Sequence, residues 1–283
     1  MSDAKMIVSV ASGKGGTGKT SVAVNMALSV GNVQLLDCDV EEPNVHMLLH
    51  PEINKKESVY ASIPKVDRQL CNACGECTKF CQFNAIFVTS NKILVFPELC
   101  HSCGGCALVC KRDAINWEKH KIGTLHFGTG DGLSLVYGEL EVSKPLAVPV
   151  IKAVKKQIKK GENVILDSPP GTSCPFVETV SGSDFCVLVT EPTPFGLHDL
   201  KIAVEVLRKM GVPFGTVVNR AGIGDKKVYE YCRKENIRIM LEIPYQRRIA
   251  ELYSKGIPFS SEILEWEEKF QSLYDEIREL VRK

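Results

Sequence analysis

The run Gly13–Thr20 has the residue types and the spacing that bind the phosphates of a nucleotide. It fits the pattern G-x4-G-K-[ST], in which glycine backbone N–H groups point at a polyphosphate. The lysine of this pattern contacts the β- and γ-phosphates, and the hydroxyl that follows it holds Mg²⁺. The predicted nucleotide contacts are Gly13, Lys14, Gly15, Gly16, Thr17, Gly18, Lys19, Thr20 and Ser21.

The segments on either side of this run are those that a phosphate-binding loop requires. Met6–Ser12 is short, apolar and β-branched, which predicts a strand, whereas Thr20–Val30 has apolar residues at helical spacing and stops at Gly31. The N-terminus of such a helix adds its dipole to the backbone donors. The alternative is a glycine-rich turn that matches by chance, but chance does not account for the flanking strand and helix.

Two cysteine runs form a second candidate site. Cys71, Cys74, Cys77 and Cys81 recur 29 positions later as Cys100, Cys103, Cys106 and Cys110. Each run has the spacing C-x2-C-x2-C-x3-C of bacterial ferredoxins, in which the fourth cysteine of one run binds the cluster of the other. We therefore predict two 4Fe-4S clusters. The ligands of cluster 1 would be Cys71, Cys74, Cys77 and Cys110, and those of cluster 2 would be Cys81, Cys100, Cys103 and Cys106.

Zinc is the competing interpretation of these cysteines, because it also binds four thiolates. Zinc sites use C-x2-C pairs separated by a longer arm, rather than three cysteines in one tight turn. The runs depart from the ferredoxin pattern at one point, since Gln82 and Lys111 stand where proline usually follows the fourth cysteine. This departure affects the local turn and the cluster potential more than the ligands.

Composition limits the class of protein. Hydrophobic residues make up 44% of the 283 residues and charged residues 24%, as in soluble globular proteins, and the formal net charge of +1 gives no support for binding nucleic acid. No apolar run is long enough to span a membrane, and Met1–Lys5 leads directly into the first strand, so we expect a cytoplasmic location without a signal peptide. Twelve cysteines in such a location favour metal binding over disulfides.

The remaining sequence predicts an α/β fold with a doubly wound, mostly parallel sheet. Further strands are predicted at Val33–Asp37, Asn163–Asp167, Phe185–Thr190 and Thr216–Asn219, with a hairpin at Leu125–Glu141. Helices are predicted at Leu146–Lys160, Leu197–Met210, Lys226–Asn236 and Glu262–Arg282. We predict a P-loop ATPase domain formed by residues 1–57 and 122–283, and an inserted two-cluster ferredoxin-type domain formed by residues 58–121.

A second lysine, Lys14, lies inside the phosphate-binding loop, where an ordinary P-loop does not require one. The sequence KGGTGKT resembles the deviant Walker A motif of the MinD/ParA/Mrp group, to which the nitrogenase iron protein also belongs. The resemblance implies that Lys14 reaches the nucleotide of a partner subunit, and therefore that ATP closes a homodimer. A solvated loop lysine is the alternative.

Two acidic motifs strengthen the resemblance. The segment from Asp37 to Asn44 resembles switch I of this group, which implies that Asp39 orients the attacking water and that Asp37 lies near the Mg²⁺ shell. The segment from Asp167 to Thr172 resembles switch II of Mrp-type proteins. In that motif Asp167 would act on Mg²⁺ through water, completing an Mg²⁺ site made of Thr20, Asp37 and Asp167.

Two further contacts to ATP follow from the resemblance. The backbone of Gly171 would meet the γ-phosphate, and Asn219, which ends a predicted strand, matches the asparagine that reads adenine. Cys174 lies seven residues after Asp167, the offset of the cluster cysteine in the nitrogenase iron protein. It is a candidate additional metal ligand, and the alternative is a small semi-buried residue packed between Thr172 and Pro175.

The resemblance implies a dimeric Mg-ATP hydrolase with Lys14, Lys19 and Asp39 as catalytic residues, coupled to the two clusters. Its work would be electron transfer to a protein partner or metallocluster assembly. An Mrp-type cluster carrier is the first alternative, although those proteins use a C-x-x-C near their end and none follows Cys110 here. A MinD-like positioning factor is the second, but residues 262–283 hold seven acids and four bases, unlike a basic membrane-surface helix.

Overall fold

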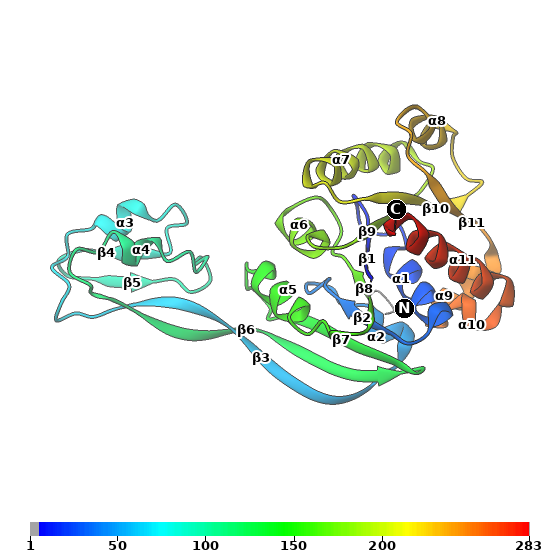
Figure 1. The fold of residues 1–283 in the computed structure, drawn as a ribbon. Helices are drawn as coiled ribbons and strands as arrows, with labels where there is room; N and C mark the ends of the chain where they lie inside the picture. The colour runs from blue at the N-terminus through cyan, green and yellow to red at the C-terminus, as the bar shows by residue number, and fades with distance from the viewer. Residues whose placement is uncertain (1–5, 283) are drawn as a thin grey trace.

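The computed structural model describes residues 6–282, so Met1–Lys5, which we expected to lead into the first strand, lie outside the described residues. Nine strands of the described chain form one sheet in the order β11-β10-β9-β1-β8-β2-β7-β6-β3 (Figure 1). The parallel strands are β1 (Ile7–Ala11), β2 (Val33–Asp37), β7 (Leu133–Leu140), β8 (Asn163–Asp167), β9 (Phe185–Thr190), β10 (Phe214–Ala221) and β11 (Ile239–Pro244). Two antiparallel strands, β6 (Ile115–Gly130) and β3 (Glu52–Val66), complete one edge.

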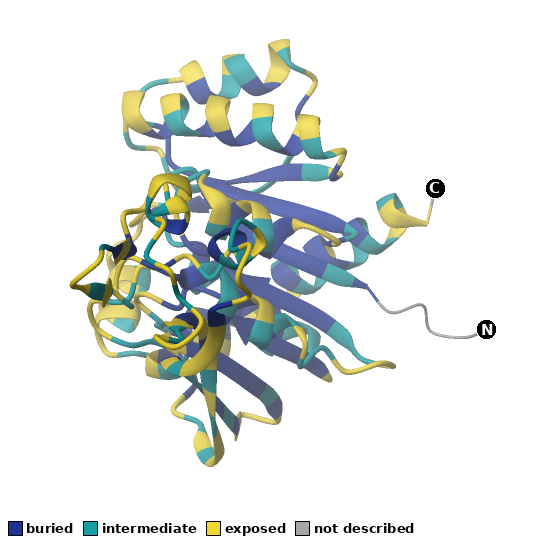
Figure 2. Cartoon of the chain, turned by 90° about the vertical axis from the view of Figure 1, so that its left-hand side faces the viewer, coloured by how far each residue is buried: buried dark blue, intermediate teal, exposed yellow. Residues whose placement is uncertain are grey.

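Helices cover both faces of the sheet, as a parallel sheet requires. One face packs against α1 (Lys19–Val30), α2 (Val45–Leu49), α9 (Arg247–Ser254), α10 (Phe259–Glu262) and α11 (Leu264–Val281). The other face packs against α5 (Ala147–Lys155), α6 (Cys174–Val180), α7 (Pro194–Met210) and α8 (Lys227–Lys234). The central parallel strands β1, β2, β8 and β9 are buried along nearly all of their length, whereas β11 at the sheet edge is mostly half-buried (Figure 2).

The helices and strands predicted for residues 1–57 and 122–283 are present, but α5, α8 and α11 are shorter than expected, α5 by the most. We predicted a helix at Leu146–Lys160, but α5 ends at Lys155. Beyond it the chain is held by Gln34, whose amide donates to the carbonyl oxygen of Gln157 and accepts from the backbone N–H of Lys159. These two hydrogen bonds to Gln34 of β2 end the helix. The local sequence of the helix does not predict them, because Gln34 is distant in the chain.

The two antiparallel edge strands extend far beyond the sheet. They pair from Glu52 opposite Thr129 to Val66 opposite Ile115, and the resulting ribbon carries residues 67–114 away from the body (Figure 1). These residues, called the cysteine unit below, contain α3 (Glu76–Phe80), α4 (Gly105–Leu108) and the pair β4 (Ile86–Val88) and β5 (Ile93–Val95). The predicted domain boundaries at 58 and 121 fall inside the ribbon, so the division into domains stays a proposal.

Candidate functional site: a nucleotide edge and two cysteine cavities

The residues predicted to bind the nucleotide meet where the parallel strands end, at a sheet edge called the nucleotide edge below. The P-loop follows β1, Asp37 and Asp167 end β2 and β8, and Asn219 lies near the end of β10. Because these strands are parallel neighbours, their carboxyl ends deliver polar side chains to one place. Gly18, at φ +90°, precedes the first turn of α1, a conformation that a residue with a side chain rarely adopts.

One ion pair and one hydrogen bond between side chains organise this edge. The Lys19 ammonium donates to Asp39 Oδ2 at 2.8 Å, and the Thr20 hydroxyl donates to Asp167 Oδ2 at 2.6 Å. Asp37 instead accepts backbone N–H groups, from Asp39 at 2.9 Å and from two residues at the start of α2. Lys19 therefore contacts Asp39, Thr20 contacts Asp167, and Asp37 fixes the loop that carries Asp39.

Burial perturbs these charges strongly. It raises the pKa of Asp167 to about 6, against the opposing effects of Lys19 and Thr20. It also raises the pKa of Asp37, with the charge of Asp167 as the next cause. For Lys19 burial lowers the pKa, but the surrounding carboxylates outweigh it and the net shift is upward. Three acids around one lysine leave an excess of negative charge that suits a divalent cation.

Unpartnered atoms at this edge fit a phosphate and a metal ion. Asp167 Oδ1 and Thr17 Oγ1 are buried and have no hydrogen-bond partner among the described residues. Buried polar atoms are almost always paired, so exceptions call for a ligand. We infer that the residues present fit Mg²⁺ and a polyphosphate. Gly171 differs from expectation, because its backbone N–H donates to the carbonyl oxygen of Ser12 at 3.1 Å, and a γ-phosphate contact requires this bond to open.

A cavity of about 740 Å³ adjoins the P-loop and has the position expected for a base. Its lining includes Gly16, Ser21, Asn219, Arg220 and Tyr245. The Asn219 amide donates to the carbonyl oxygen of Thr17 at 2.8 Å, so the loop and the strand are fixed to each other. The predicted adenine contact stays a prediction, but Asn219 does line this cavity.

Lys14 is not free in the described chain. Its ammonium forms an ion pair with Glu191, whose other oxygen accepts from Arg220 at 2.9 Å. Sequence reasoning missed both partners, because Glu191 lies 177 positions away and the segment after β9 carries no recognised motif. The solvated loop lysine that we considered is wrong in one respect, since a specific carboxylate holds this side chain.

The eight cysteines of the unit line two separate cavities. Cys71, Cys74, Cys77 and Cys110 line one, and Cys81, Cys100, Cys103 and Cys106 line the other. Within residues 6–282 no three His, Cys, Asp or Glu side chains meet closely enough to hold one metal ion. Each set instead lines a cavity, of about 20 Å³ for the first set and about 420 Å³ for the second. A 4Fe-4S cube needs ligands that are spread apart, because each thiolate binds a different iron.

The backbone repeats along with the cysteines. Left-handed residues occur at matching positions of the two runs, namely Ala73 and Ser102, Gly75 and Gly104, and Asn84 and Asp113. Cys81 and Cys110 each accept at 3.4 Å from the backbone N–H four positions later. Burial raises the pKa of Cys106 to about 11, so metal binding there must displace a proton. The cavities, the repeated turns and the backbone donors to sulfur fit two cubane clusters.

The other cysteines have different environments. Cys38, Cys186 and Cys232 are buried and free. Cys174 is exposed at the first position of α6. The semi-buried packing role that we considered for it is therefore wrong, because the side chain is exposed.

The comparisons with known proteins agree with this geometry. Residues 8–259 match the family described as the CobQ/CobB/MinD/ParA nucleotide binding domain. The chain belongs to this family. An uncharacterized protein of Methanocaldococcus jannaschii is 32% identical over 282 residues and 98% of each chain. An iron-sulfur cluster carrier protein of Pyrococcus horikoshii is 28% identical over 90% of this chain and 79% of its own length.

A solved structure supports the fold of this family member. The septum site-determining protein MinD of Pyrococcus horikoshii, in complex with Mg-ADP, superimposes with a TM-score of 0.60 at 18% identity, over 98% of this chain and 97% of its own. This confirms the predicted α/β P-loop fold with a mostly parallel sheet. Among the described residues, no helix is both long and apolar enough to cross a membrane.

Proposed function

We propose that this family member is a Mg-ATP-dependent ATPase that dimerises on ATP and whose nucleotide switch is coupled to two resident 4Fe-4S clusters. The observation that carries the proposal is the sorting of eight cysteines into two crossed sets, each around its own cavity, in a chain that also holds a complete nucleotide edge. The clusters would supply one-electron transfer.

The nucleotide edge has the groups that phosphoryl transfer to water needs. Lys19 and the P-loop backbone bind and orient the phosphates, and Lys14 of a second subunit adds positive charge at the γ-phosphate. Asp39 holds the attacking water once its bond to Lys19 is exchanged for one to solvent. Thr20, with Asp167 and Asp37, would hold Mg²⁺, which neutralises charge on the phosphate oxygens.

A packed connection joins the nucleotide edge to the ribbon. Asp37 on β2 pairs with Tyr137 on β7, and Tyr137 pairs with His126 on β6, the strand that runs on to the cysteines. The Tyr137 ring is stacked between His46 of α2 and His126, with ring centroids 4.9 and 4.4 Å apart. A movement of switch I therefore has a direct mechanical route to the ribbon.

The surface of the cysteine unit favours a protein partner. Its exposed side chains include eight large apolar ones. They are Leu70, Phe80, Phe83, Phe87, Leu94, Phe96, Leu99 and Leu108. Where such side chains form one patch, the patch marks an interaction site. We propose that a redox protein or a metallocluster-assembly protein docks here.

Cluster delivery is the second candidate, favoured by the printed name of the Pyrococcus horikoshii relative. One anaerobic experiment separates the two functions. Protein with reduced clusters is given Mg-ATP together with a redox acceptor or an apo-ferredoxin, and iron in each protein is counted. We expect electrons to move while the iron stays. Loss of iron to the apo-protein during turnover would overturn the resident-cluster proposal and establish delivery.

A further inference from the structure

The ion pair between Lys14 and Glu191 holds Lys14 within its own subunit, whereas the proposed reaction requires this side chain to be free. Lys14 is the side chain expected to cross to a second subunit, yet here its ammonium is bound to a carboxylate of its own chain. The Glu191 side chain is 8% exposed and that of Lys14 is 28% exposed. An ion pair this far withdrawn from solvent is screened less than a surface pair.

Glu191 is fixed in place before it binds Lys14. It directly follows β9, and its carbonyl oxygen accepts from the Thr193 N–H at 2.8 Å. The Thr193 hydroxyl in turn accepts from the Gly196 N–H at 3.0 Å, which caps the start of α7. The carboxylate therefore projects from a rigid corner between a core strand and a long helix, as a preformed acceptor.

Arg220 keeps the Glu191 carboxylate charged after Lys14 leaves. It donates to Glu191 Oε2 at 2.9 Å, whereas Lys14 contacts Oε1, so the two cations use different oxygens. Burial would raise the pKa of Glu191, but the hydrogen bond and charge of Lys14, together with Arg220, lower it instead. Release of Lys14 thus leaves no buried charge without a partner, which keeps the cost of release small.

We propose that Glu191 is a latch, a positioning residue that holds Lys14 within its own subunit until ATP closes the dimer. This inference rests on the proposed role of Lys14 across the dimer. Because Arg220 also lines the base cavity, a nucleotide entering that cavity contacts the second partner of the latch. Each dimer must open two latches, so the effect of the latch on dimer formation is squared.

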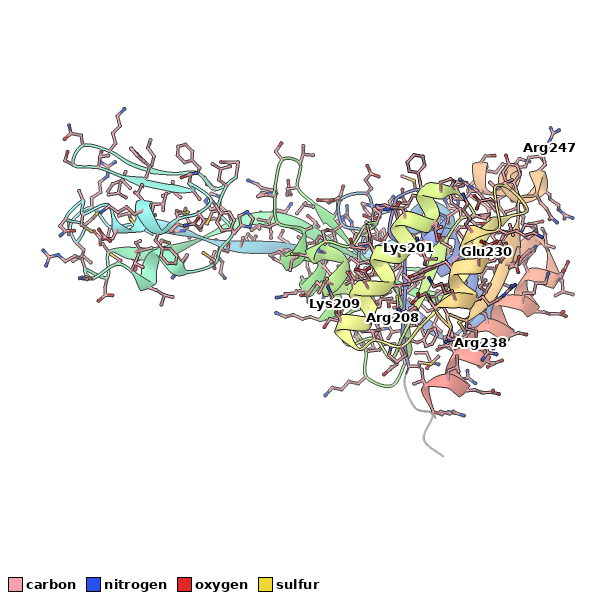
Figure 3. The ribbon with its side chains drawn as sticks, turned by 90° about the horizontal axis from the view of Figure 1, so that it is seen from above. Lys201, Arg208, Lys209, Glu230, Arg238 and Arg247 are labelled. Atoms are coloured by element: carbon pink, nitrogen blue, oxygen red, sulfur yellow. The ribbon has the colours of Figure 1, made fainter. Side chains whose placement is uncertain are left out.

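The first test measures the latch in the nucleotide-free protein. Acetylation of Lys14 by acetic anhydride is followed by peptide mass spectrometry in the wild type and in Glu191→Gln. A pair of this exposure shifts an equilibrium by up to about fivefold, so we expect Lys14 to react about five times faster in the variant. Glu235→Gln is the matched control, because Glu235 pairs with Arg208 in the last turn of α7 (Figure 3), at the opposite end of this helix from Glu191.

The second test measures dimer formation by sedimentation with Mg²⁺ and AMPPNP. Glu191→Gln should lower the dimer dissociation constant about 25-fold, the square of the single-latch effect. Arg220→Gln should have the opposite effect in the acetylation test on the nucleotide-free protein. Lys14 becomes the sole cation on Glu191 in this variant, so it should be acetylated more slowly than in the wild type. This variant keeps the inference testable if Glu191→Gln fails to fold.

The outcomes separate the latch from the proposed function. Unchanged Lys14 acetylation in Glu191→Gln, or acetylation that changes in the same direction in both variants, would overturn the latch. Faster acetylation without tighter dimers would show that the contact exists but does not restrain assembly, and would also overturn it. A wild type that stays monomeric with AMPPNP would instead overturn the dimer of the proposed function, whatever the acetylation result.

Discussion

The nucleotide edge and the cysteine unit differ in whether their reactive side chains have hydrogen-bond or ion-pair partners within the protein. At the edge, Lys19 is bound to Asp39, Thr20 to Asp167 and Lys14 to Glu191. In the cysteine unit the thiols surround two cavities, and some accept only long backbone hydrogen bonds. The protein therefore supplies partners for these groups at the edge, whereas the thiols of the unit are left for the clusters that we propose.

The two regions also differ in what stabilises them. The edge rests on a sheet with helices on both faces, but the unit has a small core of Cys77, Ile86, Val88 and Cys106, which packs against Ile115 of β6. Two of these five residues are predicted ligands, and α3 and α4 have five and four residues. Helices this short are not stable by themselves. The unit should thus depend on its metal for folding, as small metal domains generally do.

Metal removal should produce the largest effect and should be confined to the unit. When iron is stripped anaerobically with a chelator, we expect amide hydrogens of residues 67–114 to exchange at least about 100-fold faster, because local opening then costs little. Amides of β1, β8 and β9 serve as the internal control and should keep their protection. Equal protection of residues 67–114 with and without iron would contradict the comparison.

Lys14→Ala should nearly abolish hydrolysis while leaving nucleotide binding intact. Lys19 and the loop backbone still bind the phosphates, but a charge that acts mainly in the transition state is lost, so the turnover rate should fall about 100-fold or more. Lys19→Ala is the contrasting variant and should weaken binding as well, since Asp39 and Asp167 would lose their buried counter-ion. Hydrolysis at the wild-type rate by Lys14→Ala would refute the cross-subunit role.

The crossed ligand sets predict a specific pattern of iron loss. Cys81→Ser should remove about four of about eight irons, because it damages the cluster held by the second run. Adding Cys100→Ser should cost no more iron, whereas adding Cys71→Ser should remove the remainder. Cys232→Ala is the control, since that buried cysteine lies in the core formed with α7 and α8. If the Cys81 and Cys71 changes together cost only one cluster, the sets are not crossed.

Local sequence signals account for much of the fold. Strands β2, β8 and β9 have the predicted bounds because each is a short apolar run that ends at a functional or polar residue. The ribbon was missed, because β3 mixes charged and apolar residues and gains its pairing from β6, tens of positions away. The site shows the same limit, since the P-loop follows from one motif but the partners of Lys14 depend on where β9 and β10 end.

The aromatic stack of His46, Tyr137 and His126, which joins the edge to the ribbon, should make the free energy of unfolding depend on pH. Burial, followed by the charge of Lys56, lowers the pKa of His126 despite Glu139, and burial also lowers the pKa of His46. The folded protein therefore keeps neutral rings where the unfolded chain takes up protons, near pH 6.5 and below. The free energy of unfolding should decrease as pH falls from 7.5 through 6.5, by less than about 1.4 kcal/mol per pH unit for each ring.

His126→Phe tests this dependence, because it removes one titrating ring and keeps an aromatic ring beside Tyr137. Denaturant unfolding at several pH values should give a shallower decrease below pH 7 than in the wild type. The same substitution of His198, which is exposed on α7, controls for the added phenyl ring. A slope unchanged by His126→Phe would show that the stack does not titrate in this range.

Cys174→Ser should have the smallest effect, because this thiol belongs to neither of the contrasting regions. It is exposed at the start of a seven-residue helix, and surface changes of this kind alter stability by less than about 0.5 kcal/mol. A two-fold dimer would bring two such thiols together, but a 4Fe-4S cluster normally takes four. We therefore expect unchanged iron per chain, measured with and without AMPPNP. A loss of iron confined to the AMPPNP-bound dimer would reverse this expectation and establish a bridging site next to switch II, placing metal chemistry directly at the nucleotide edge.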